Sequence, residues 1–181
     1  EEATDYALIL DYDYIHPAQW NEQVWVKYLT SDGKVNEAIV DTDEGNFDRI
    51  NKAPGDVVKF RIDDENEFVV VYDFDVVQTS VNYVDADEDM LFIGDGSYNA
   101  SDVVVFYYDE FFGDVAYGVL TGEEAIADLE GREVDVRQIE AEEATTVDNI
   151  GEVLMLNVTD IYAPATQYAY ILTDAYTHTT S

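Results

Sequence analysis

The sequence predicts an all-β protein with two small antiparallel β-barrel or β-sandwich modules and one short helix near 123–130. Short runs rich in β-branched and aromatic residues recur along the chain, and many alternate between apolar and polar positions, as half-buried strands do. Clusters of Asp, Gly, Ser and Pro separate these runs, which is typical of turns. Apolar residues make up 47% of the 181 residues, enough to bury cores despite the charge.

The first module is expected to span residues 1–79. Between two of its strand-like runs lies the pair Asp32-Gly33, a hairpin signal, because such pairs adopt the backbone conformation that tight turns need. Five or six short strands in so short a segment favour a small, strongly curved barrel or sandwich. The predicted strands are Tyr6–Tyr14, Gln23–Leu29, Val35–Val40, Val57–Ile62 and Phe68–Phe74.

The second module is expected to span residues 80–165 and continues the same pattern. A short helix is predicted where acidic Glu123 and Glu124 come early and Gly131 provides a stop. Pro164 marks the end of this module. The predicted strands are Val81–Val84, Met90–Ile93, Asp102–Tyr108, Val115–Leu120, Val134–Ile139 and Val153–Val158.

The last residues of the chain repeat its first. Tyr168–His178 matches Tyr6–His16 at a constant offset of 162 residues, and both histidines of the chain fall at the same place in the pattern. A period of this length indicates whole domains in an array rather than a solenoid of short units. Residues 166–181 then form a linking strand without a module of its own. A lone strand with an apolar face needs a partner for its backbone.

The partner is either the rest of a covalently following module or the sheet of a neighbouring subunit, which this donor strand would join by β-augmentation. The alternative is that both segments are similar edge strands of one domain. The assembly-strand residues that carry the pattern are Tyr168, Tyr170, Ile171, Leu172 and Tyr176, and those of the equivalent or acceptor strand are Tyr6, Leu8, Ile9, Leu10 and Tyr14.

The charge of the chain excludes some partners. With 8 basic and 41 acidic residues the formal net charge is −33, which repels nucleic-acid phosphates and anionic membrane surfaces. No apolar run approaches the roughly 18 residues of a transmembrane helix, so no membrane insertion is expected. Such a charge repels itself unless cations screen it.

Calcium is therefore the metal expected, although no cofactor is required. Asp41 and Asp43 in one loop, and Asp85, Asp87 and Asp89 in another, offer the alternating carboxylates that calcium prefers. Neither loop completes an EF-hand. The alternative is a solvated acidic surface that binds no ion specifically.

No catalytic site is expected. The chain has no cysteine, and its two histidines, His16 and His178, both lie in the repeated strand rather than in a constellation with a nucleophile and a carboxylate. With 41 carboxylates, some pair lies at glycosidase spacing by chance, so acidity alone does not support a glycosidase.

Tyrosine dominates the aromatic residues, and aromatic rings can line sugar-binding grooves by stacking on pyranose faces. Trp20 and Trp25 are the first candidates for such stacking. The alternative places these aromatic residues in the core or in subunit interfaces, where tyrosine is also common.

Three segments, Val26–Val35, Pro54–Phe60 and Asp102–Tyr107, resemble the β-rich repeats of bacterial surface-layer-type proteins. The final Tyr168–Ala175 is similar to the strand that closes or links such repeats. The resemblance implies an extracellular structural role at the cell surface and supplies no catalytic residues.

We therefore expect a non-enzymatic structural subunit of an extracellular surface layer or filament, assembling head to tail with copies of itself. The chain begins at Glu1 without methionine or an apolar signal region, as a mature secreted chain or an excised fragment would. The alternative is a carbohydrate-binding module of a secreted protein, in contact with a cell wall or another glycan.

Overall fold

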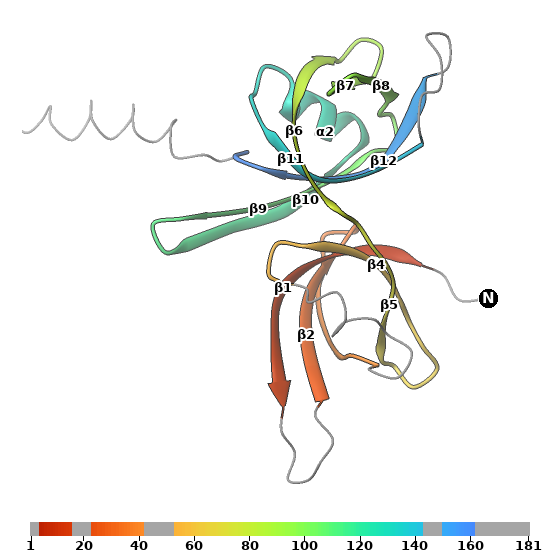
Figure 1. Cartoon of the computed structure of the whole chain (residues 1–181), viewed down its shortest axis with the longest axis vertical. Coiled ribbons are helices and arrows are strands. Elements are labelled where there is room, and N and C mark those ends of the chain that lie inside the picture. Colours follow the sequence, from red (N-terminus) through yellow and green to blue (C-terminus); the bar gives the residue numbers. More distant parts are fainter. Residues whose placement is uncertain (1–3, 16–22, 42–52, 143–149, 162–181) are drawn as a thin grey trace, which may run out of the picture.

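The computed structural model describes residues 4–15, 23–41, 53–142 and 150–161. These residues form short strands and, within the described part, one α-helix, which confirms the predicted all-β class with a short helix (Figure 1). The helix α2 spans Gly122–Leu129, where 123–130 was expected. The strands are β1 (Asp5–Ile15), β2 (Gln23–Thr30), β3 (Val35–Ile39), β4 (Val57–Ile62), β5 (Phe68–Asp73), β6 (Val76–Asp85), β7 (Met90–Ile93), β8 (Gly96–Asn99), β9 (Val104–Phe111), β10 (Asp114–Thr121), β11 (Asp135–Ala141) and β12 (Gly151–Thr159).

The first five strands form a closed barrel, called barrel 1 below, with the strand order β3-β2-β1-β4-β5. Its centre is β1, which pairs antiparallel with β2 along most of its length and with β4 over Asp5–Leu8. A parallel bridge between Val40, just after β3, and Phe68 of β5 brings the two outer strands together. The barrel therefore closes where the third and fifth strands run parallel.

Alternation along the strands produces the core of barrel 1. In β2, every second side chain points inward, and the side chains between them face outward. The hairpin predicted at Asp32-Gly33 joins β2 to β3, and Gly33 has a φ of +83° there. The buried core residues are Ala7, Ile9, Val24, Val26, Tyr28, Val40, Val58, Phe60, Phe68 and Val70.

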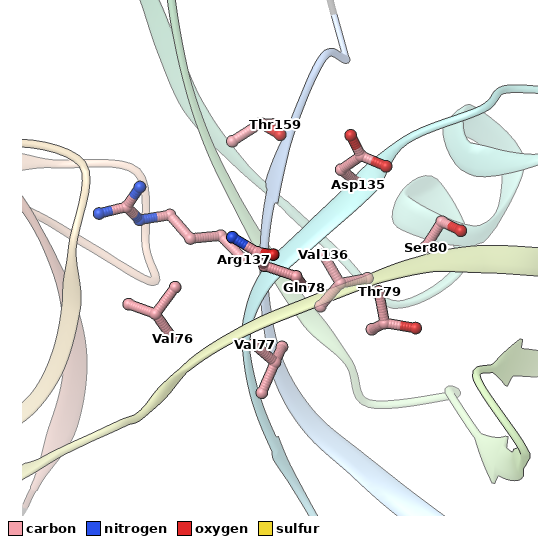
Figure 2. Close-up of a pocket in the computed structure, with 9 residues that line it drawn as sticks. All are labelled: Val76, Val77, Gln78, Thr79, Ser80, Asp135, Val136, Arg137 and Thr159. Atoms are coloured by element: carbon pink, nitrogen blue, oxygen red, sulfur yellow. The ribbon is translucent and has the colours of Figure 1, made fainter.

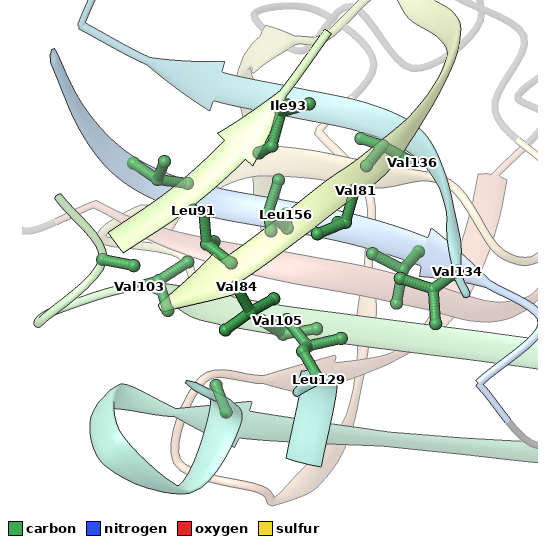
Figure 3. Packing of buried hydrophobic residues seen from close by; sticks show 14 of the residues in the cluster. Val81, Val84, Leu91, Ile93, Val103, Val105, Leu129, Val134, Val136 and Leu156 are labelled. Carbon is green, nitrogen blue, oxygen red and sulfur yellow. The ribbon is translucent and has the colours of Figure 1, made fainter. Parts of the chain in front are cut away.

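A second barrel, called barrel 2, consists of β6, β7, β8, β11 and β12 in the order β8-β7-β6-β11-β12. It closes through parallel pairing of β12 with β8, at Gly151 opposite Tyr98 and Glu152 opposite Asn99. The helix α2 buries its apolar face in this core, where Leu129 joins strand residues of the barrel (Figure 3).

The strands of the two barrels are connected in the same order. In each, a long first strand lies between the second and the fourth, and the third strand meets the fifth in parallel. This is the connectivity of the OB-fold, a five-stranded Greek-key barrel. In barrel 2 the helix comes just before the fourth strand, β11. The described chain is therefore a tandem of two barrels of the same design.

A hairpin of β9 and β10 is inserted in barrel 2 between β8 and α2. β9 pairs in parallel with β12, so the hairpin extends the sheet beyond the barrel (Figure 1). Phe112 and Gly113 form its two-residue turn with φ values of +49° and +81°. Positive φ at both positions defines a type I′ turn, and a phenylalanine rarely adopts this conformation.

The structure differs from the sequence expectations in two places. β6 begins at Val76, so the chain passes from barrel 1 to barrel 2 at 74–75, and position 79 lies inside a strand. The sequence pattern does not predict β8, because Gly-Ser-Tyr-Asn contains no β-branched residue, and its pairing with β7 and β12 makes it a strand. The predicted linking strand 166–181 lies outside the described residues.

Candidate functional site

The two barrels meet across an apolar contact. Residues of barrel 1 that are not part of its own core pack against the β9 and β12 region of the second sheet. At the edge of this contact Gly55 has a φ of +95°, and a Cβ atom there would lie 3.1 Å from Cδ1 of Tyr108. The buried members of the contact are Leu8, Leu29, Val57, Phe74, Phe106 and Met155.

A buried glutamine side chain of barrel 2 binds the backbone of barrel 1. Gln138 of β11 is 0% exposed. Its Oε1 accepts a hydrogen bond from the backbone N–H of Val57 at 2.8 Å, and its Nε2 donates to the carbonyl of Phe74 at 2.8 Å and to that of Val57 at 3.3 Å. Buried amides that are bonded in this way hold their partners in one arrangement, since each lost bond would leave a buried polar group unpaired.

Asn157 and an ion pair extend the same network. Asn157 Nδ2 donates to the Gly55 carbonyl at 2.8 Å and to Gln138 Oε1 at 2.7 Å. On the solvent side, Arg137 donates to Asp56 Oδ1 from Nη2 at 2.6 Å and from Nε at 3.2 Å. Three side chains of β11 and β12 therefore bind the chain segment that leads into β4.

Sequence reasoning missed these residues, although a signal for them exists. Val134, Val136 and Gln138 alternate along one predicted strand, and Asn157 lies within the apolar run Val153–Val158. An uncharged amide at a position where the alternation requires an apolar side chain indicates a buried polar partner.

The structure places the five residues of the predicted equivalent strand in β1. Leu8 and Ile9 are fully buried, Tyr6 and Leu10 are partly buried, and Tyr14 is 40% exposed. Since β1 has β2 on one side and β4 on the other, this strand is a central one. Their counterparts Tyr168, Tyr170, Ile171, Leu172 and Tyr176 lie outside the described residues.

Of the predicted calcium ligands, Asp41 lies in an acidic cluster. Carboxylate oxygens of Asp41, Asp63 and Glu67 lie within 4.8 Å of one another. The backbone N–H groups of Glu67 and then Glu65, each 2.9 Å from Asp63 Oδ1, lower the pKa of Asp63 and favour its charged form. Three hard oxygen donors at this spacing could hold a calcium ion. Asp43 lies outside the described residues.

The other predicted ligands form the turn between β6 and β7. Asp85 Oδ1 accepts the backbone N–H groups of Asp87 at 3.1 Å and Glu88 at 3.2 Å, and Asp89 has a φ of +53°. Asp85 thus caps its own turn, while Asp89 adopts the left-handed conformation for which glycine is favoured. Calcium at this turn stays a prediction.

Trp25 lies on the outer face of barrel 1. In β2 it alternates with the buried Val24 and Val26, and its Nε1 donates to Glu37 Oε1 on β3 at 2.9 Å. Across the other strand pair it lies opposite Asp13 of β1, which is exposed. A half-buried indole is therefore flanked by carboxylates on an open sheet surface. Trp20 lies outside the described residues.

A surface pocket of about 520 Å³ lies over β6 and β11 (Figure 2). Arg137 points from it toward barrel 1 and its partner Asp56, which leaves hydroxyls, an amide and the carboxylate of Asp135 at the pocket. Partial burial, and then the carboxylates of Asp135 and Asp109, raise the pKa of the nearby Asp160. This region concentrates negative charge, and the described residues at the pocket include no histidine.

No helix in the described ranges is long and apolar enough to cross a membrane. Comparisons with protein-family models, with curated proteins and with solved structures found no match.

Proposed function

We propose that this chain is a structural unit of an extracellular surface layer or filament, in which copies follow one another head to tail through the strand 168–178. The observation that carries the proposal is the repetition of one barrel design along the chain, followed by a segment whose sequence repeats the first strand. A protein built from successive barrels of one connectivity is suited to forming an array.

The contact between the barrels supports this role. The buried amides of Gln138 and Asn157 bind the backbone at Gly55, Val57 and Phe74, so barrel 2 is attached to main-chain atoms of barrel 1 rather than to side chains alone. Such a contact keeps successive barrels at a fixed angle, which a regular layer or filament requires.

The position of β1 supports the role of the terminal strand. In both described barrels the first strand is central, paired with the second and the fourth. A segment that repeats β1 therefore carries the sequence of a strand that pairs with neighbouring strands in a sheet. Its pairing is completed by a following module or by a second subunit.

Electron microscopy of the purified chain tests this proposal. Filaments or sheets are expected from the full chain and not from a variant that lacks residues 166–181. Assemblies that form equally well without these residues would rule out the terminal strand as the connection.

We further propose that cations reduce the self-repulsion of the acidic subunits, with calcium bound at Asp41, Asp63 and Glu67. The double variant Asp63→Asn with Glu67→Gln is expected to lose the rise in melting temperature that calcium produces. The matched control carries Asp95→Asn with Glu133→Gln, two exposed carboxylates outside both predicted calcium loops, and is expected to keep it. Equal responses of both variants would indicate diffuse screening instead.

A second candidate function is carbohydrate binding, because Trp25 lies on the face of barrel 1 that β2 and β3 form. Ligands of OB-type barrels bind on this face, and an indole flanked by carboxylates can stack on a sugar ring while its hydroxyls are bonded. Titration calorimetry with cell-wall oligosaccharides tests this function. Trp25→Ala should abolish binding, whereas the control Tyr83→Ala, at a 60% exposed tyrosine of β6, should preserve it. Absence of heat with every oligosaccharide would exclude this candidate.

A further inference from the structure

The outer edge of β10 has no strand partner among the described residues. β10 is the terminal strand of the seven-stranded sheet and pairs with β9 alone. In barrel 1 the two terminal strands meet at Val40 and Phe68, and β8 at the other end of the second sheet meets β12. β10 is thus the end of a sheet that closure does not protect.

The turn of the hairpin determines which backbone groups face this edge. In a two-residue hairpin the closing pair, here Phe111 and Asp114, exchanges hydrogen bonds, and bonded pairs then alternate along the ladder. The N–H and C=O groups of Val115, Tyr117 and Val119 therefore point away from β9. They form a row of donors and acceptors that a further strand can pair with.

This edge lacks the features that normally prevent strand addition. β10 has the sequence Asp-Val-Ala-Tyr-Gly-Val-Leu-Thr, without lysine, proline or a bulge. Its exposed apolar side chains form one group with the turn, since Phe112 is 75%, Val115 40% and Tyr117 41% exposed. The group continues the buried contact between the barrels, to which Val119 and Tyr108 already belong.

From this edge we infer that β10 accepts residues 168–176 of a second copy of this chain, as the strand beside it. This inference rests on the proposed head-to-tail assembly and names the surface that receives the terminal strand. The lengths are similar, because residues 168–176 are nine residues and β10 has 8. Two aromatic residues of one face of the segment, Tyr168 and Tyr170, would lie beside Val115 and Tyr117, and cross-strand pairs of aromatic and β-branched residues are favourable.

The distribution of charge also supports residues 168–176 as the strand that pairs with β10. The chain has 41 acidic residues among 181, yet Asp174 is the single acidic residue of 161–181, and Asp114 is the single one of β10. Pairing these two segments therefore brings few carboxylates together, whereas most contacts between copies of this chain would be repulsive.

Cysteine cross-linking tests the inference directly, because the chain has no cysteine of its own. A full chain carrying Val115→Cys is mixed with a full chain carrying Tyr170→Cys under mild oxidation. Disulfide-linked dimers of one chain of each kind are expected. The matched control replaces Val115→Cys by Tyr83→Cys, a more exposed position on β6, and should still give about tenfold less mixed dimer.

Tyr117→Pro provides a second variant with an intact hairpin. The N–H of Tyr117 points away from β9, so proline should leave the β9–β10 ladder in place while it blocks an added strand. Circular dichroism should show an unchanged fold, and the mixed dimer should decrease about tenfold.

Three outcomes would overturn the inference, and they are distinguishable. A chain carrying both Val115→Cys and Tyr170→Cys that closes into a cross-linked monomer at high dilution would show that the segment covers the edge of its own copy. Filaments that form and need residues 166–181, but give no cross-link at β10, would place the acceptor elsewhere and leave the proposed function intact. Absence of both filaments and mixed dimers would refute this inference and the proposed function together.

Discussion

Replacing Gln138 by methionine tests how strongly the buried amides couple the two barrels. Methionine has nearly the same length and shape but can neither donate nor accept the bonds that Gln138 makes. The substitution leaves the N–H of Val57, one N–H of Asn157 and the carbonyl of Phe74 without their partner in a site that water does not reach.

The expected cost follows from these orphaned groups. A buried donor or acceptor that loses its partner costs about 1–3 kcal/mol, and the methionine side chain recovers part of this by packing. We expect the free energy of unfolding to fall by about 3 kcal/mol. With a urea slope of about 2 kcal/mol/M this loss moves the midpoint down by roughly 1.5 M.

Urea unfolding followed by two signals separates the barrels. The two tryptophans, Trp20 and Trp25, belong to the barrel 1 part of the sequence, whereas far-ultraviolet circular dichroism reports both barrels. The two curves should coincide for the parent chain and separate for Gln138→Met, because coupling through the amides makes unfolding cooperative.

The matched control is Gln78→Met on the neighbouring strand β6, where the glutamine is exposed. It should change the free energy of unfolding by less than about 0.5 kcal/mol. A Gln138→Met variant that stays equally close to the parent chain, with coincident curves, would show that apolar contact alone couples the barrels.

Three further substitutions probe other parts of the structure by thermal and urea unfolding. Arg137→Met leaves the carboxylate of Asp56 buried without its cation and should cost about 2 kcal/mol, and no loss would mean that solvent screens this pair. Phe112→Asn gives the type I′ turn its preferred residue and should stabilise the chain by about 1 kcal/mol, whereas destabilisation would mean that the ring packs in the monomer. Asparagine at position 160 can adopt the φ of +66° that Asp160 has. Asp160→Asn also removes a carboxylate whose pKa is raised in the folded protein, so that its charged form destabilises the fold. The gain in stability should be largest at neutral pH and should disappear as the pH falls through the raised pKa toward the ordinary value of 3.8. A gain in stability that persists below this range would contradict this reasoning.

The sequence predicted most strands of this fold because each is a local pattern. Alternation in Gln23–Leu29 and the pair Asp32-Gly33 depend on a few neighbouring residues, and the structure has the strands and the hairpin there. Gly96–Asn99 carries no such pattern, since it becomes a strand only through pairing with β7 and β12. The shared connectivity of the barrels likewise depends on pairings between distant residues.

The candidate sites likewise combine residues that a local pattern indicates with residues that only the fold brings to them. Asp41 was a predicted ligand, but its neighbours Asp63 and Glu67 come from the next hairpin and are brought to it by the bridge between Val40 and Phe68. The network around Gln138 joins residues 81 positions apart, so local alternation indicates that a polar side chain is buried there but not which atoms it binds.

The placement of β1 and β12 has a mechanical consequence. Both strands are paired on two sides, β1 with β2 and β4, and β12 with β11 on one side and with β8 and β9 on the other. Tension that enters the chain along either of them loads the ladders on both sides at once. Neither strand can peel away one hydrogen bond at a time, as the edge strand β10 can, so tension along β1 or β12 has to break the ladders on both sides together.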